Sequence, residues 1–314
     1  MLALLKDTGR DKAVWVGRSS TSFPSLAMYL TSTAHDWGCG SLWTFTACYP
    51  EHCIAAAGLC VPYGLIELGL EEILKTVDRN IYPEDEYPYG QWSYQKFYET
   101  DFEKASAFFD ADIPAFLRAS RVKGNPESVG KPGALAHVLK DGGWMGGAEK
   151  PDPKYRHIPL EYTVYDSEDT FNEFVAAMEK TGFWAADAWY SNHDRNRAYT
   201  LKNRKNDGNL EFPVLFVSYI NFSAVPAAAV YTVPTDKFQQ IHATYDTTCA
   251  TADNPKIMAN MRRQCKNLKE AKVDASHFVA EEKPAEVNAI IAKWLLEEVE
   301  GIWPAKWAGK ESVL

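Results

Sequence analysis

The aspartate in the tetrapeptide HDWG is well placed for chemistry. Upstream, the run AVWVG (13–17) is short, apolar and closed by glycine, as expected of a buried strand entering a tight turn. Downstream, apolar side chains follow helical spacing from Cys39 to Thr46. A Ser/Thr-rich tract, residues 18–34, separates the two, and HDWG, which contains Asp36, looks like the other side of that turn, where the helix N-terminus favours a negative charge. Such a carboxylate could act as a nucleophile, or it could simply cap the helix.

Two residues late in the chain could assist a nucleophile. His277 lies in DASHFVAEEKP, between an expected strand and the last helix, and Asp246 lies in HATYDTTC. A histidine can remove a proton from water, and an aspartate can orient the imidazole and stabilise its charged form. The simpler alternatives are a surface histidine and an aspartate that closes an Asx turn.

Two tyrosines occur in aromatic-rich motifs, Tyr94 in QWSYQKFY and Tyr190 in AWYSNHDRN. A positioned phenol can donate to an alkoxide as its charge develops, although an aromatic residue on a helix more often serves packing. Tyr98 in the first motif is a rival to Tyr94. Trp37 and Trp189 could line a pocket beside these residues, and core packing explains either equally well.

Strand and helix patterns alternate at both ends of the chain. The small apolar run 54–61 stops at Pro62, as expected of a buried parallel strand, and FPVLFV (212–217) has the same signature. A helix that begins at Pro284 follows a further strand and the loop with the late histidine. Between these parts, residues 63–209 are aromatic-rich and helical. The pattern predicts an α/β sheet that carries a helical cap.

Composition excludes several classes of protein. The chain has 314 residues, 46% of them hydrophobic, and a formal net charge of -9, which argues against a surface that binds nucleic acid. No window reaches the length of a membrane span. The six cysteines lack C-x-x-C spacing, which favours buried free thiols in a reducing compartment over zinc or disulfides. The first apolar stretch is too short for a secretory signal, so we expect a cytoplasmic protein.

The motifs HDWG, GQWSYQKFY, GFWAADAWYSNHDRN, HATYDTTC and ASHFVAEEKPAEVN together resemble the epoxide hydrolase branch of the α/β-hydrolase fold. The resemblance implies a mostly parallel sheet with flanking helices and an inserted helical cap. It divides the chain into a first part of the core (1–62), the cap (63–209) and a second part of the core (210–314).

The resemblance also implies a reaction. Asp36 would attack a carbon of a small lipophilic epoxide while Tyr94 and Tyr190 donate to the oxygen, giving an ester on the enzyme. Water activated by His277 and Asp246 would then release a vicinal diol.

In this scheme two tryptophans lie beside the reacting atoms. The backbone N–H of Trp37 would contribute to the oxyanion site, and Trp189 would line the pocket. The reaction needs epoxide and water as partners and neither a metal nor an organic cofactor.

The sequence departs from the family in two ways. In the family, four strands precede the strand that corresponds to AVWVG, and one of their loops, HGxP, supplies an oxyanion donor. This chain begins just before that strand, so we expect an N-terminal truncation that removes those four strands. Two in-frame insertions, residues 18–34 and 218–241, also interrupt family motifs, and they resemble translated introns of a eukaryotic gene.

Two alternatives stay open at this point. A hydrolytic haloalkane or haloacid dehalogenase would use the same three catalytic residues but would bind a departing halide; the tyrosine pair favours the epoxide. The chain could also be a catalytically inactive, truncated gene product, because losing strands exposes a sheet edge and removes part of the core.

Overall fold

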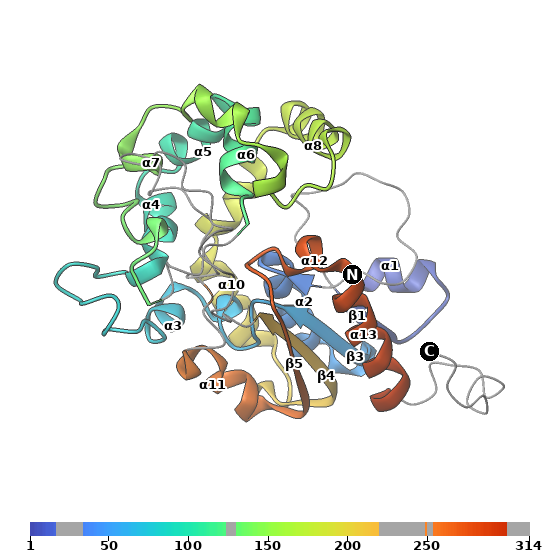
Figure 1. Ribbon diagram of the computed structural model, residues 1–314. Helices are drawn as coiled ribbons and strands as arrows, with labels where there is room; N and C mark the ends of the chain where they lie inside the picture. Colours follow the sequence, from blue (N-terminus) through green and yellow to red (C-terminus); the bar gives the residue numbers. More distant parts are fainter. Residues whose placement is uncertain (17–33, 124–129, 220–248, 250–253, 300–314) are drawn as a thin grey trace.

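A computed structural model describes the chain except for residues 17–33, 124–129, 220–248, 250–253 and 300–314 (Figure 1). Asp246 and most of both predicted insertions lie outside the described residues. The helices are α1 (Leu2–Asp7), α2 (Trp37–Cys48), α3 (Leu70–Leu74), α4 (Ser93–Thr100), α5 (Phe102–Asp110), α6 (Ile113–Ser120), α7 (Trp144–Gly147), α8 (Glu168–Thr181), α9 (Trp184–Asp187), α10 (His193–Asn203), α11 (Pro255–Gln264), α12 (Val279–Glu282) and α13 (Pro284–Glu298). The strands are β1 (Ala13–Val16), β2 (Ala34–His35), β3 (Cys53–Leu59), β4 (Leu210–Tyr219) and β5 (Cys265–Val273).

The described strands form one parallel sheet in the order β1-β3-β4-β5, and β2 also pairs with β3. Side chains of the central strands alternate between two hydrophobic clusters: Val214 and Phe216 of β4 join one, whereas Leu215 and Val217 join the other. Burial of both faces explains why these strands read as continuous apolar runs. Helix α13 crosses one face of the sheet, and helices α4 to α8 gather in the upper part of the view (Figure 1).

Strands β1 and β2 lie in one line along the edge of β3. Val16 pairs with Ala57, and Ala34 pairs with Gly58, the next residue of β3. The pairing thus continues from β1 into β2 as though Ala34 followed Val16. This register agrees with an insertion between the two strands, although its origin stays a prediction.

Strand β4 is longer than expected. The sequence predicted its end at residue 217, where the second insertion would begin, but Ser218 and Tyr219 continue the ladder opposite Lys272 and Val273 of β5. Two residues assigned to that insertion therefore belong to the strand, because they extend its pairing with β5.

Two helices show how the sequence sets their ends. Helix α8 begins where the Ser167 hydroxyl accepts a hydrogen bond from the Thr170 N–H, and it ends at Gly182, whose φ is 66°. Helix α13 begins with Pro284, whose missing N–H costs nothing in a first turn. Helix α13 thus begins at the proline where the sequence predicted it.

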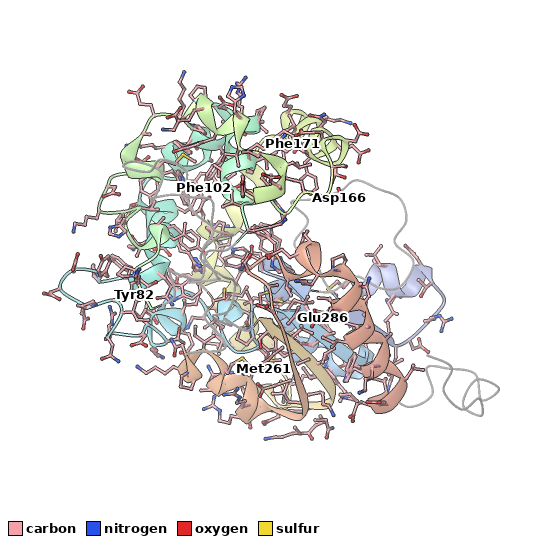
Figure 2. All side chains as sticks on the ribbon, in the orientation of Figure 1. Tyr82, Phe102, Asp166, Phe171, Met261 and Glu286 are labelled. Carbon is pink, nitrogen blue, oxygen red and sulfur yellow. The ribbon has the colours of Figure 1, made fainter. Side chains whose placement is uncertain are left out.

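The helices between β3 and β4 bury aromatic side chains in the larger hydrophobic cluster, which also reaches the sheet. Phe102 and Phe171 lie in this helical part, whereas Met261 of α11 and Glu286 of α13 lie beside the sheet (Figure 2). Among the helices that the structure describes, none is both long and apolar enough to cross a membrane.

Candidate active site

Asp36 occupies a strained turn between β2 and α2. Its backbone has φ 51° and ψ -127°, close to the first central position of a type II′ turn, where glycine is usual. A non-glycine residue there costs free energy and is found mostly at functional sites. The side chain makes no capping hydrogen bond to α2, so the simple N-cap alternative is not what the structure shows.

Trp37, the first residue of α2, links this turn to the helical part of the molecule. Its ring lies edge-on to Tyr190 at 5.0 Å between centroids and stacks on the half-exposed Trp189 at 6.2 Å. The ring of His193, which begins α10, lies 5.7 Å away. As the first helical residue, Trp37 has a backbone N–H without an acceptor inside the helix, so it can bind an oxyanion.

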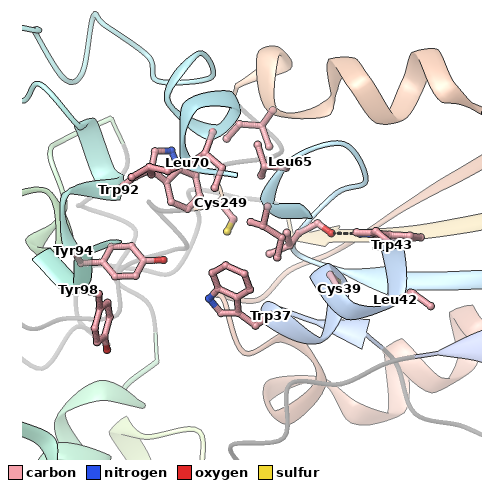
Figure 3. Close-up of a cluster of buried hydrophobic side chains, with 14 of the residues drawn as sticks. Trp37, Cys39, Leu42, Trp43, Leu65, Leu70, Trp92, Tyr94, Tyr98 and Cys249 are labelled. Carbon is pink, nitrogen blue, oxygen red and sulfur yellow. Dashed lines mark hydrogen bonds between the residues drawn. The ribbon is translucent and has the colours of Figure 1, made fainter. Parts of the chain in front are cut away.

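Tyr94 and Tyr98 of α4 face different partners. Tyr94 packs edge-on against Tyr190 at 5.5 Å, and its hydroxyl accepts a hydrogen bond from the Gln95 amide at 3.0 Å. The Tyr98 hydroxyl instead donates to Asp187 at 3.0 Å. Figure 3 shows the Tyr94 ring directed toward Trp37, whereas the Tyr98 ring points elsewhere. The two rivals from the sequence thus differ, and Tyr94 is the one whose ring faces Trp37.

Tyr98 supports Tyr190 from behind. Their rings stack at 4.5 Å with an angle of 6° between the planes. Burial, the nearby tyrosines and the charge of Asp36 raise the pKa of Tyr190 well above its ordinary value, so Tyr190 keeps its proton. Burial likewise raises the pKa of Asp187 to about 8, against the opposing effect of the Tyr98 hydrogen bond.

His277 lies in the loop between β5 and α12, beside the residue that precedes Asp36. The rings of His277 and His35 are 4.6 Å apart, and the Nε2 of His35 is 2.6 Å from the backbone oxygen of His277. Burial and the nearby His277 lower the pKa of the His35 imidazole, against the opposing charges of Glu281 and Asp36. The late histidine is therefore brought to the Asp36 turn, as the sequence predicted.

The structure brings six of the seven predicted site residues into one region: Asp36, Trp37, Tyr94, Trp189, Tyr190 and His277. Asp246, the seventh, lies outside the described residues.

Sequence reasoning missed three side chains of this region: His35, Asp187 and the buried His193, whose ring nitrogens have no hydrogen-bond partner among the described residues. His35 and Asp187 contact residues that are distant in the sequence, so no local pattern predicts their place in the site. His193 could have been noticed as a histidine directly after the Tyr190 motif.

The arrangement supplies a carboxylate on a strained turn, an imidazole beside it, and two phenols, those of Tyr94 and Tyr190, that could donate a proton. A carboxylate nucleophile with phenol donors can open a strained ether, and an imidazole can activate the water that cleaves the resulting ester.

No family model matches the chain. Epoxide hydrolase A of Mycobacterium tuberculosis is 23% identical over 201 residues, which cover 62% of this chain and 50% of that protein. Bifunctional epoxide hydrolase 2 of Sus scrofa is 23% identical over 301 residues, covering 94% of this chain and 41% of that protein. The chain thus spans half the length or less of these curated relatives.

Solved structures of similar fold carry the same name. Epoxide hydrolase A from Mycobacterium thermoresistibile matches 94% of this chain and 73% of its own, with a TM-score of 0.52 and 20% identity. An epoxide hydrolase from an endophytic Streptomyces matches 93% of this chain and 70% of its own, with a TM-score of 0.57 and 17% identity. The chain has the α/β-hydrolase fold of these enzymes.

Proposed function

We propose that the chain hydrolyses a lipophilic epoxide to a vicinal diol through an ester on Asp36. The observation that carries the proposal is the strained backbone of Asp36, next to the contact of Trp37 with Tyr190. Similarity to proteins named epoxide hydrolases supports it.

In the first step, a carboxylate oxygen of Asp36 forms a bond to an oxirane carbon, and the bond from that carbon to the ring oxygen breaks. Tyr94 or Tyr190 donates its proton to the released alkoxide and becomes a phenolate. Because burial raises the pKa of Tyr190, this phenol holds its proton until the alkoxide, a stronger base, forms.

In the second step, His277 takes a proton from water, and the hydroxide attacks the carbonyl carbon of the ester. The backbone N–H of Trp37 stabilises the negative oxygen of the tetrahedral intermediate. Collapse expels the diol alkoxide, which takes the proton from the new carboxylic acid, so Asp36 becomes a carboxylate again. The imidazolium returns its proton to the phenolate, and every group regains its first state.

Asp246 remains the proposed partner of His277, and residues 63–209 remain the proposed cap. The half-exposed Trp189 and the aromatic rings around it favour an apolar substituent on the epoxide. The cytoplasmic location expected from the sequence also stays a prediction.

A single turnover in water labelled with heavy oxygen tests the ester route. With enzyme in excess over styrene oxide, the first diol should carry no label, because its new oxygen comes from the Asp36 carboxylate. The label should appear in the enzyme, in the peptide that contains Asp36. Label in the first diol would mean that water attacks the epoxide directly and would overturn the proposal.

A His277→Gln variant provides a second readout. If His277 activates water only in the second step, this variant should accumulate an enzyme heavier by the mass of one epoxide, while the unmodified chain should not. His157→Gln, in a 3₁₀ turn of the helical part, is the matched control and should behave as the unmodified chain. Release of halide from a haloalkane without hydrolysis of styrene oxide would favour the dehalogenase alternative instead.

A further inference from the structure

Three potential metal ligands meet beside the proposed site, and only one of them takes part in the proposed reaction. His35 ends β2, Cys60 directly follows β3, and His277 lies in the loop after β5. One ligand atom of each side chain lies within 4.8 Å of those of the other two. Because β2 and β3 are parallel and His35 pairs with Leu59, the strand ends place His35 and Cys60 at the same edge of the sheet.

Two of the three side chains meet at one backbone atom. The backbone oxygen of His277 lies 2.6 Å from the Nε2 of His35 and accepts a hydrogen bond from the Cys60 thiol at 3.3 Å. Cys60 has φ 66°, a left-handed conformation that is unfavourable for a residue with a side chain. A strained residue whose side chain meets two histidines is a candidate for function rather than for packing alone.

We propose that His35, Cys60 and His277 form a binding site for a borderline-soft divalent cation of the Zn²⁺ type, and that an ion bound there blocks epoxide hydrolysis. A thiolate and two imidazoles suit Zn²⁺, whereas Mg²⁺ and Ca²⁺ take oxygen ligands. Three protein ligands leave a fourth position of a tetrahedral ion for water.

The ligand atoms are close enough for an ion to draw them together. Zn²⁺ binds nitrogen at about 2.0 Å and sulfur at about 2.3 Å, so two ligand atoms of a tetrahedral ion lie about 3.5 Å apart. The three ligand atoms, now within 4.8 Å of one another, must approach by up to about 1.3 Å, and rotation of the half-buried His277 side chain on its loop can supply part of that movement. The carboxylates of Glu281 and Asp36 lie near enough to act electrostatically on His35, so negative charge is available beside the cluster.

The consequence for catalysis rests on the proposed function, whereas the site itself does not. His277 would use a ring-nitrogen lone pair to take a proton from water. A metal bound to that nitrogen occupies the same lone pair, so the ion and the proton compete. Hydrolysis of the ester should stop while the ion is bound and should resume when a chelator removes it.

Spectroscopy of the full chain with Co²⁺ in place of Zn²⁺ tests the site without any assay of activity. One Co²⁺ per chain should give the charge-transfer absorption of a cobalt–thiolate bond, and added Zn²⁺ should abolish it. Cys60→Ser should remove this absorption and weaken Zn²⁺ binding by about 100-fold or more, measured against a chromophoric chelator.

Cys265→Ser is the matched control, because Cys265 is also buried but begins β5 at the opposite end of the sheet. It should leave the absorption unchanged. If Cys60→Ser fails to fold, His277→Gln on its loop replaces it and should weaken Zn²⁺ binding to a similar degree. Equal Zn²⁺ affinity in the unmodified chain and in the folded variant, or no thiolate absorption at all, would overturn the site.

Inhibition is measured separately. Zn²⁺ should lower the rate of styrene oxide hydrolysis, and Cys60→Ser should need about 100-fold more Zn²⁺ for the same fractional loss from its own metal-free rate. Inhibition with equal Zn²⁺ sensitivity in both proteins would contradict the blocking role. If the metal-free chain shows no hydrolysis, the proposed function fails, and the cobalt spectrum alone decides on the metal site.

Discussion

The sheet side of the proposed site and its tyrosine side are positioned by different interactions. On the sheet side, backbone geometry places Asp36: β2 pairs with β3, α2 begins at Trp37, and the turn between them has a positive φ. On the tyrosine side, Tyr94 and Tyr190 contact each other and neighbouring rings, with Tyr98 hydrogen-bonded behind them. Main-chain pairing supports one side, and side-chain packing supports the other.

This difference predicts different responses to substitution. The sheet side depends on the one carboxylate that lies on the strained turn, so its loss should abolish the reaction. The tyrosine side has two phenols that contact each other, so losing one should leave partial function. Its buried Asp187 also makes it sensitive to pH. The predictions below test this contrast.

The largest effect is expected for Asp36→Asn. The amide keeps the shape of the side chain but is a poor nucleophile, so kcat for styrene oxide should fall by about 1,000-fold or more. Asp207→Asn is the matched control, because Asp207 also has a positive φ, of 52°, in a 3₁₀ turn before β4. An Asp36→Asn chain with more than a tenth of the original kcat would remove Asp36 from the mechanism.

A smaller, graded effect is expected for the tyrosines. Tyr94→Phe and Tyr190→Phe should each lower kcat by roughly tenfold, and the double variant by roughly 100-fold or more, since general acids contribute this much. The rings remain, so packing should change little, but Tyr94→Phe also removes the acceptor of the buried Gln95 amide and should cost about 1–3 kcal/mol of stability. Tyr165→Phe, at another buried tyrosine, should leave kcat unchanged. If the loss of kcat in a single variant is explained fully by a smaller fraction of folded chain, the tyrosine serves packing rather than proton donation.

Much of the sheet side could be predicted from the sequence, because its signals are local. HDWG before a helical pattern indicated a turn into a helix at Asp36, and the helix expected from Cys39 to Thr46 lies within α2, Trp37–Cys48. The late histidine lies in the loop after β5, between a strand and the last helices of the described chain, and its catalytic role stays a prediction. Local alternation and capping residues carry this information.

The tyrosine side was harder to predict. The sequence proposed Tyr94 and left Tyr98 as a rival, because helical spacing cannot show which hydroxyl finds a distant carboxylate. The hydrogen bond from Tyr98 to Asp187 joins residues 89 positions apart. The contact of His35 with His277 spans 242 positions. Such pairs depend on how the elements meet in space, so a single sequence contains no local signal for them.

Asp187 should make stability depend on pH. Its pKa is raised to about 8 in the folded chain from an unfolded value near 3.8. The unfolded chain therefore loses this proton at lower pH than the folded chain. The stabilisation is complete below pH 4 and is lost as pH rises toward 8, at about 1.4 kcal/mol per pH unit between these limits.

Asp187→Asn removes this titration. Urea unfolding is measured at pH 5, 6 and 7. Between pH 5 and 7 the free energy of unfolding of the unmodified chain should fall by roughly 3 kcal/mol more than that of the variant. Asp85→Asn, at an exposed carboxylate, serves as the control and should keep the original slope. Parallel curves for the unmodified chain and Asp187→Asn would show that Asp187 ionises normally in the folded chain.

The smallest effect is expected from a deletion on the sheet side. Val16 and Ala34 pair with consecutive residues of β3, so deleting 17–33 joins β1 to β2 in register. Removing the segment between two paired positions abolishes its closure entropy and should raise the free energy of unfolding by about 2 kcal/mol. Hydrolysis should be retained or improved, because the Asp36 turn keeps its place on β3.

A deletion that is one residue shorter is the matched control. Deleting 18–33 leaves Gly17 between Val16 and Ala34, which moves the turn by one residue and turns the side chains that follow to the opposite face. This chain should be less stable than the one lacking 17–33, and its hydrolysis should fall with the displaced Asp36. Equal stability and activity of the two deletions would mean that pairing with β3 does not position the nucleophile, and the contrast between the two sides of the site would be lost.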